Sequence, residues 1–201
     1  MSRAYDKILS LLENNQQSVI DWLNERADDV ETYVYLQRNS KLPLDRAYKE
    51  NYWDFYRLFR LGNVHRDFYF SILERYLKKS VIRDGDFENI LDELKDRTNK
   101  YWFSYTTKLI HTINNDYPIY DDNLRRVFAW GDVYGNRAAI LERYSTLKVS
   151  ISELLSDTRT KEFIEKMRRN FDSLSEISDT KIFDFALWAL GDLIRRGIII
   201  P

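Results

Sequence analysis

The chain has 201 residues and a formal net charge of −1, and it contains no cysteine, two histidines, six glycines and three prolines. The lack of cysteine excludes disulfides, thiolate zinc sites and cysteine nucleophiles, and two histidines are too few for a multi-histidine metal site. No segment has the apolar run of a signal peptide or the roughly 20 apolar residues of a membrane span. We therefore expect a soluble cytoplasmic protein without a metal or other cofactor.

Scarce helix breakers and abundant Leu, Ile, Arg, Glu and Lys favour a mostly helical protein. Apolar residues recur at helical spacing, and no repeat, low-complexity tract or long linker divides the chain. The sequence predicts an all-α protein with a single compact domain over residues 1–201. In chain order, the expected helices cover residues 4–13, 18–36, 44–61, 64–79, the stretch from 87 to 94, 102–113, the segment after 118, 138–147, 151–155, the stretch from 163 to 171, and a last helix that begins at 178–179.

The predicted helix over residues 44–61 has an apolar face and a basic face. Aromatic residues recur along it at intervals of four, three and four, at Tyr48, Tyr52, Phe55 and Phe59. The opposite face carries four cations and a tryptophan, namely Arg46, Lys49, Trp53, Arg57 and Arg60. Such a face could neutralise phosphates and stack a nucleic-acid base, or it is a solvated or protein-binding face with one snorkelling aromatic. The surrounding segment 37–79 has ten basic and five acidic residues, which makes it the candidate patch for a nucleic acid.

Residues 117–129 indicate a turn followed by a helix start. Pro118 disfavours the α region for Tyr117, so the preceding helix must end there. Asp121 or Asp122 can then accept hydrogen bonds from the free N–H groups of the next helix. A carboxylate fixed at such a position is either a helix cap or a catalytic acid–base group. The residues alone leave both interpretations open.

Lys108 and His111 lie about one turn apart in the predicted helix 102–113. They could converge with Asp121 in a cleft, and a positioned carboxylate with a lysine supplies the groups for glycosidic-bond cleavage, with or without a Schiff base. The alternative is a hydrogen-bonded structural histidine and an exposed lysine. The candidate catalytic residues are therefore Asp121, Lys108 and His111. The chain has no Gly-rich phosphate loop, HExxH motif or GxSxG elbow, which sets aside kinase, P-loop and α/β-hydrolase chemistry.

The run from Tyr117 to Ala129 resembles a segment of the helix-hairpin-helix DNA glycosylases, especially of their adenine-mismatch branch. In that segment a Pro-hydrophobic-x-Asp turn supplies the catalytic aspartate and opens a helix with basic residues. The positions that follow this pattern are Pro118, Ile119, Asp121, Asn123, Arg126 and Val127. Residues 107–111 followed by 118–121, and residues 181–191, are also similar to a group of uncharacterised bacterial proteins that are assigned an 8-oxoguanine-glycosylase-like fold.

The resemblance implies a glycosylase-like helical arrangement and, in an active protein, excision of a base from DNA by N-glycosidic hydrolysis. It implies that Asp121 stabilises positive charge on the sugar or activates the nucleophile, with Lys108 or Lys100 assisting. Residues 95–104, where the family carries a Gly-rich hairpin, contain no glycine. Phosphate contacts are expected from Arg46, Lys49, Arg57, Arg60, Arg125 and Arg126. The aromatic pocket for a flipped base is expected from Trp102, Phe103, Tyr120 and Trp130.

A second hypothesis is a non-enzymatic helical module that binds a protein partner in a bacterial defence or regulatory system. Asp121 would then be only an N-cap, and Trp53 with the neighbouring arginines would belong to the interface. The sequence leaves open whether the protein is an enzyme. It predicts DNA as one partner and a protein as the alternative, and no contact with a membrane.

Overall fold

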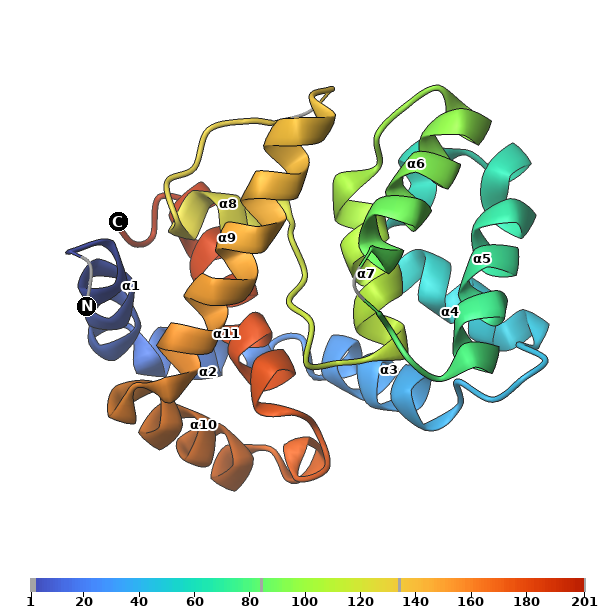
Figure 1. Cartoon of the computed structure of the whole chain (residues 1–201). Coiled ribbons are helices and arrows are strands. Elements are labelled where there is room, and N and C mark those ends of the chain that lie inside the picture. The colour runs from blue at the N-terminus through green and yellow to red at the C-terminus, as the bar shows by residue number, and fades with distance from the viewer. Residues whose placement is uncertain (1–2, 84, 134, 201) are drawn as a thin grey trace.

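The computed structural model describes residues 3–83, 85–133 and 135–200, and within them the chain forms eleven α-helices, three short 3-10 helices and no strand (Figure 1). The predicted all-α fold is confirmed. None of the described helices is long and apolar enough to cross a membrane. The elements are α1 (Arg3–Asn14), α2 (Gln16–Asn24), α3 (Ala27–Arg38), α4 (Arg46–Phe55), η1 (Leu58–Leu61), η2 (Asn63–His65), α5 (Arg66–Lys79), α6 (Asp86–Thr98), α7 (Phe103–Ile113), α8 (Asp122–Val127), α9 (Arg137–Ser156), α10 (Thr158–Asn170), η3 (Asp172–Leu174) and α11 (Asp179–Arg195).

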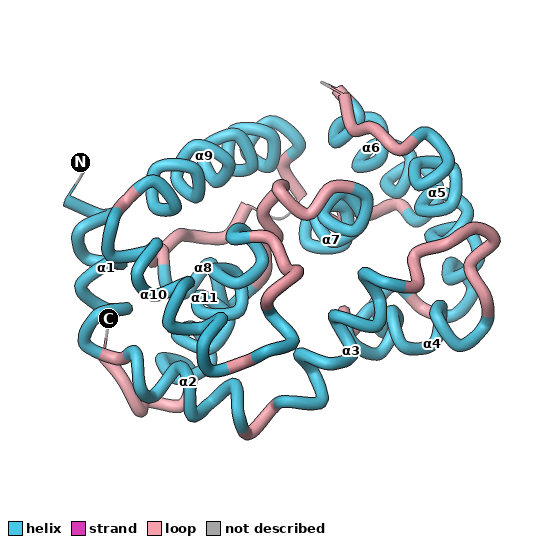
Figure 2. The backbone as a smooth tube through the Cα atoms, turned by 90° about the horizontal axis from the view of Figure 1, so that it is seen from below, coloured by secondary structure: helices cyan, strands magenta, loops and turns pink. Residues whose placement is uncertain are grey.

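Two hydrophobic cores divide these helices into two lobes (Figure 1). The core of the first lobe is built mainly from α1, α2 and α8 to α11, so this lobe combines both ends of the chain. The core of the second lobe is built mainly from α4 to α7. Helix α3 joins them, because Val30 and Tyr33 belong to the first core and Leu36 to the second. Figure 2 shows that α2, α3 and α4 succeed one another along one side of the molecule. Phe55 and Tyr117 pack against both cores and thus fasten the lobes together.

The predicted helix 18–36 is two helices, α2 and α3, which are separated at Glu25 and Arg26. Neither residue is a helix breaker, so local propensity does not set this break. The break reorients the chain, so that Trp22 of α2 and Tyr33 of α3 are both buried in the first core. Conversely, the predicted helices 138–147 and 151–155 form one continuous helix, α9.

The predicted helix 44–61 ends early, and this changes which side chains are exposed. Helix α4 ends at Phe55, and Arg57 takes a left-handed conformation with φ 52° before η1 begins. Tyr52 is buried as expected. The expectation that Trp53 lies on an exposed basic face is wrong, because it is only 4% exposed in the core of the second lobe. Phe59, expected in the apolar stripe, is instead 58% exposed.

The backbones of helices α8 and α11 are in direct contact, at Asn123 and Gly191. A Cβ atom added to Gly191 would lie 2.3 Å from the carbonyl oxygen of Asn123, far inside a normal contact. Only a glycine allows this approach. Because Asn123 follows Asp121 by two residues, the contact fixes the start of α8 on the last helix of the chain.

Candidate functional site

A cleft of about 1260 Å³ lies between the two lobes. Its walls come from the end of α4 and η1, the connection between α6 and α7, the start of α8, the exposed side of α11, and the junction of α2 and α3. Eleven Lys and Arg residues and five Asp residues line it, a net of +6 in a chain whose total is −1. The cations are Arg26, Arg57, Arg60, Lys95, Lys100, Lys108, Arg125, Arg126, Lys181, Arg195 and Arg196. The lining of the cleft is therefore net positive, although the chain as a whole is slightly negative.

Lys108 projects from α7 into the cleft. Its Nζ donates a hydrogen bond to the carbonyl oxygen of Tyr56 at 2.8 Å and lies 5.3 Å from the ring centroid of Tyr105. Burial lowers the pKa of Lys108 to about 8, although the charges of Asp121 and Asp184 oppose that shift. About a tenth of these side chains are then neutral at pH 7. The neutral form of a lysine amine is a nucleophile.

Asp121 is the N-cap of α8, and its Oδ1 accepts a hydrogen bond from the backbone N–H of Leu124 at 2.8 Å. The same side chain lines the cleft that Lys108 enters. Burial and the charge of Asp184 raise the pKa of Asp121, while the Leu124 N–H and the charge of Lys108 hold it down. The cap interpretation is confirmed, and it leaves Oδ2 for the cleft. The side chain of Asp121 therefore both caps α8 and lines the cleft.

His111 lies behind this site rather than in it. It is fully buried and is not among the residues that line the cleft. Because a carbonyl only accepts, Nδ1 donates to the carbonyl oxygen of Tyr117 at 2.7 Å, and Nε2 accepts from the hydroxyl of Tyr33 at 2.9 Å. The expected place of His111 beside Asp121 in the cleft is wrong, since its buried ring bonds the Tyr117 carbonyl through Nδ1 and the Tyr33 hydroxyl through Nε2. The alternative of a structural histidine describes it correctly.

Thr107 completes the support of the Asp121 segment. Its hydroxyl accepts a hydrogen bond from the backbone N–H of Tyr120 at 3.0 Å and donates to the carbonyl oxygen of Ser104 at 2.8 Å. The residue before Asp121 is therefore tied to α7, the helix that carries Lys108. Helix α7 positions both halves of the candidate site.

Acid should destabilise the fold through His111. Burial and the charge of Lys181 together lower its pKa from an ordinary value of 6.5 to about 4. The unfolded chain therefore takes up a proton first, so stability is complete above about pH 6.5 and decreases by up to roughly 3 kcal/mol as the pH falls to about 4. Urea unfolding between pH 7.5 and 4 measures this decrease. A His111→Gln variant should show a shallower pH dependence, and an equal dependence in both proteins would contradict the assignment.

A second lysine and aspartate lie in the cleft and were not found from the sequence. Lys181 and Asp184 lie one turn apart on α11, and Nζ of Lys181 donates to Oδ2 of Asp184 at 2.6 Å. Lys181 is only 3% exposed, with its amino group 4.5 Å from the ring centroid of Tyr33 and 4.4 Å from that of Phe185. The i, i+3 spacing was the only local signal, and it is common on helix surfaces.

The cations that were expected to contact phosphate divide into two groups. Arg57 and Arg60 are exposed and line the cleft. Arg46 and Lys49 do not line it. Their side chains pair with carboxylates of the second lobe instead, Arg46 with Glu50 at 2.7 Å and Lys49 with Glu74 at 2.8 Å. The early end of α4 and the turn at Arg57 separate the two groups.

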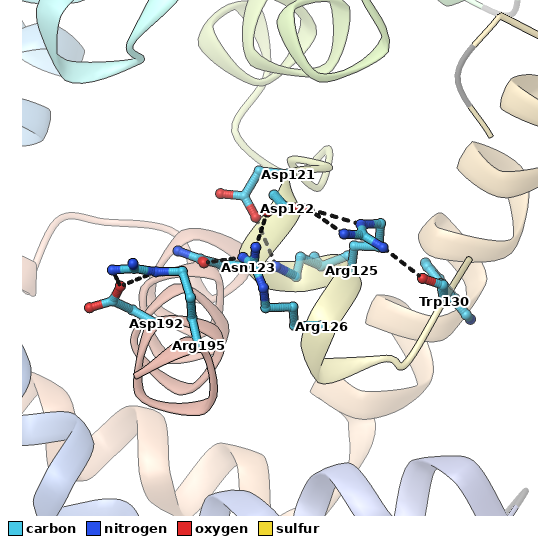
Figure 3. A network of polar contacts seen from close by, with 9 residues as sticks. Asp121, Asp122, Asn123, Arg125, Arg126, Trp130, Asp192 and Arg195 are labelled. Carbon is cyan, nitrogen blue, oxygen red and sulfur yellow. Dashed lines mark hydrogen bonds and ion pairs between the residues drawn. The ribbon is translucent and has the colours of Figure 1, made fainter. Parts of the chain in front are cut away.

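Arg125 and Arg126 lie on the cleft side of α8 and share the carboxylate of Asp122 (Figure 3). Arg125 donates to Oδ1 of Asp122 at 2.7 Å, and Arg126 also donates to Oδ1 of Asn123 at 3.1 Å. Two guanidinium groups on one carboxylate leave a positive excess at the cleft wall. The sequence correctly expected both arginines to follow Asp121 on the same short helix.

Four aromatic residues were expected to form a base pocket, and two of them line the cleft. Trp102 stacks on Tyr105 with ring centroids 5.0 Å apart, and Phe103 also contributes to the wall. Tyr120 is fully buried behind Phe103, and Trp130 packs on Phe128, so neither lines the cleft. Lys100 does line it, with its amino group 5.2 Å from the ring centroid of Trp102, but Lys100 is exposed and Lys108 is the less exposed of the two candidate lysines.

No protein-family model matches the chain, and neither a curated protein nor a solved structure matches it.

Proposed function

We propose that the protein releases a base from DNA by cleaving an N-glycosidic bond in the cleft between its lobes. The observation that carries this proposal is the pairing of a lysine of lowered pKa, Lys108, with a helix-capping carboxylate, Asp121, inside a cleft of net charge +6. The positive walls suit the phosphates of a polyanion. The lysine and carboxylate suit attack at a sugar carbon.

In the proposed reaction the neutral amine of Lys108 attacks C1′ of the deoxyribose. The bond between C1′ and the base nitrogen breaks, its electron pair leaves with the base, and the proton lost by the lysine nitrogen ends on the base. The carboxylate of Asp121 stabilises the positive charge that develops on the sugar and carries the proton between the two groups. The lysine–sugar adduct then opens to an imine, which water hydrolyses.

An enzyme of this kind must take the base out of the stack. The cleft wall offers aromatic surface for it, because Trp102, Phe103 and Tyr105 line the same cavity as Lys108. The stacked pair of Trp102 and Tyr105 presents a flat surface that any base can cover. The exocyclic groups of the base would meet the Lys181–Asp184 pair, which also lines the cleft.

Phe59 is expected to fill the gap that an extruded base leaves in a duplex. It is the only aromatic side chain among the described residues that is exposed, and it lies at the cleft between Arg57 and Arg60. We expect Phe59→Ala to slow base release from duplex DNA by roughly tenfold, since an inserted ring replaces lost stacking. Release from single-stranded DNA should be almost unchanged. Single-turnover assays on both substrates test this, with Val64→Ala as control, an exposed apolar residue outside the cleft. Equal slowing on both substrates would contradict the role.

The test of the proposed function is an excision assay with duplex and single-stranded DNA that contains 8-oxoguanine, a mismatched adenine or an undamaged base. Alkaline treatment converts each released base into a strand break, and borohydride traps an imine as a covalent complex. Activity that is lost in Asp121→Asn, with binding retained, would support the proposal. Binding of DNA without release of a base would indicate a scaffold that recognises DNA but does not cleave it. Absence of both would make a protein partner the function to pursue.

A further inference from the structure

A second cluster of charges lies at the α11 side of the cleft, and the proposed reaction does not use it. Its centre is Asp192, whose side chain is only 8% exposed. Three arginines surround this carboxylate: Arg196 at 2.8 Å, Arg195 with Nε at 3.0 Å, and Arg26 at 3.6 Å. The indole N–H of Trp22 donates to it at 2.8 Å. All five residues line the cleft. We call them the Asp192 cluster.

The Asp192 cluster has more donors than its carboxylate can use. A carboxylate offers about four acceptor positions, whereas each guanidinium carries five N–H donors. Glu25, which is 70% exposed, approaches Arg26 at 3.8 Å and is the other carboxylate in contact with these arginines in the described residues. Arg195 and Arg196 keep side-chain exposures of 52% and 37%. Unused N–H groups therefore face the cleft.

The cluster is also rigid before any ligand arrives. The guanidinium of Arg26 lies 3.9 Å from the ring centroid of Trp22, which is itself packed edge-on against Trp188 at 4.9 Å. Burial alone would raise the pKa of Asp192, but hydrogen bonds from Arg195 and Trp22 hold it below its usual value. The carboxylate stays charged and fixes the arginines. Fixed guanidinium forks lose little side-chain entropy when they bind an oxyanion bidentately.

The position of the cluster connects it with the candidate reaction centre. Asp192 follows Gly191, and the backbone of Asn123 rests on Gly191. Figure 3 shows the Asp192–Arg195 pair beside Asn123, which itself follows Asp121 by two residues. The cluster therefore lies across the α8–α11 contact from the capping carboxylate, along the same cleft.

We infer that the Asp192 cluster is a phosphate-binding site that holds a backbone phosphate of the DNA strand next to the nucleotide under attack. The inference that the phosphate belongs to DNA rests on the proposed function. The inference that the site binds phosphate rests on the arginines themselves. The shared chemistry is a phosphate oxyanion, which a phosphodiester or a free phosphorylated molecule could supply. The guanidinium groups of Arg195, Arg196 and Arg26 would bind this phosphate, and Asp192 would be the residue that positions them.

The test compares Arg195→Gln/Arg196→Gln with the control Arg38→Gln/Arg169→Gln, which removes the same charge from exposed arginines outside the cleft. One arm measures the binding of a duplex oligonucleotide as a function of salt. We expect the slope of log K against log salt to fall by about one to two in the cluster variant and to stay unchanged in the control. The other arm measures the rise in melting temperature with millimolar pyrophosphate.

A smaller salt slope, or a smaller rise in melting temperature with pyrophosphate, in the cluster variant than in the control supports the site. Loss with both probes assigns the phosphate to the DNA strand, and loss with pyrophosphate alone assigns it to a small phosphorylated molecule. Arg195→Lys/Arg196→Lys should retain the salt slope because it keeps both charges, and it guards against a folding defect. Equal behaviour of the cluster variant and the control in both arms would overturn the inference. Neither arm measures base release, so a wild type without glycosylase activity would refute the proposed function and leave this result standing.

Discussion

Replacing Lys108 with methionine is expected to reduce base release by about three orders of magnitude or more, since it removes the nucleophile and keeps the volume of the side chain. The lost hydrogen bond to Tyr56 should cost only about 1 kcal/mol of stability. Single-turnover excision assays give the rate, and borohydride trapping should show no covalent complex in Lys108→Met. The matched control is Lys100→Met, whose lysine lies over Trp102 on the cleft wall and should affect binding but not trapping. The reverse pattern would transfer the role to Lys100.

The pH dependence of the wild type provides an independent check on Lys108. Only the neutral amine attacks, and its pKa is about 8. Below that value the single-turnover rate should increase about tenfold for each pH unit, and it should level off above it. A lysine with an ordinary pKa would continue to gain rate beyond pH 9. That outcome would show that the cleft does not lower the pKa of the reacting group.

The largest effect on stability is expected from Gly191→Ala. The new Cβ would lie 2.3 Å from the carbonyl oxygen of Asn123, and neither backbone can move without separating α8 from α11. We expect a loss of about 3 kcal/mol in the free energy of unfolding, at the upper end of overpacking effects. Urea unfolding measures this loss. Gly131→Ala is the control, because a Cβ there would meet nothing within 4 Å and its backbone needs no positive φ. Similar losses in both variants would refute the close contact as the cause.

Gly191→Ala should also reduce activity beyond what its stability explains. The start of α8 would move with Asn123, and Asp121 is the cap of that helix. At low temperature, where part of the variant is folded, the rate of base release per folded molecule should therefore be lower than in the wild type. Retained activity per folded molecule would show that the position of Asp121 tolerates the shift.

The parts of the site that local rules govern could be predicted from the sequence. Helix α7 ends at Ile113, as the expected helix 102–113 does, and Asp121 caps the next helix, an effect that depends on neighbouring residues. Lys108 was a candidate because its spacing placed it on the turn before that cap. Its low exposure in the cleft and its bond to Tyr56 depend on the second lobe, and no local pattern contains that information.

The errors have a common physical origin in tertiary structure. The left-handed turn at Arg57 takes Phe59 off the face of α4, and no glycine or asparagine at that position indicates such a turn. Trp53 is buried because α4 packs it against Phe70 in the second core. The Lys181–Asp184 pair and the Asp192 cluster face the cleft only because α11 packs between α2 and α8. Such arrangements follow from the whole fold, and a single sequence shows only their separate residues.

The order of the lobes along the chain has a consequence for biosynthesis. Helices α4 to α7 are consecutive, so their core can form from local contacts while the ribosome is still at work. The other core cannot form completely until α11 has been translated, because α1 and α2 pack in the same core as this later helix. Until then Lys108 is present, but Asn123 cannot pack on Gly191 to fix the start of α8, and the cluster around Asp192 does not exist. A nascent or truncated chain would therefore carry Lys108 without Asp121 in its place beside the cleft, and the proposed reaction would be confined to the folded molecule.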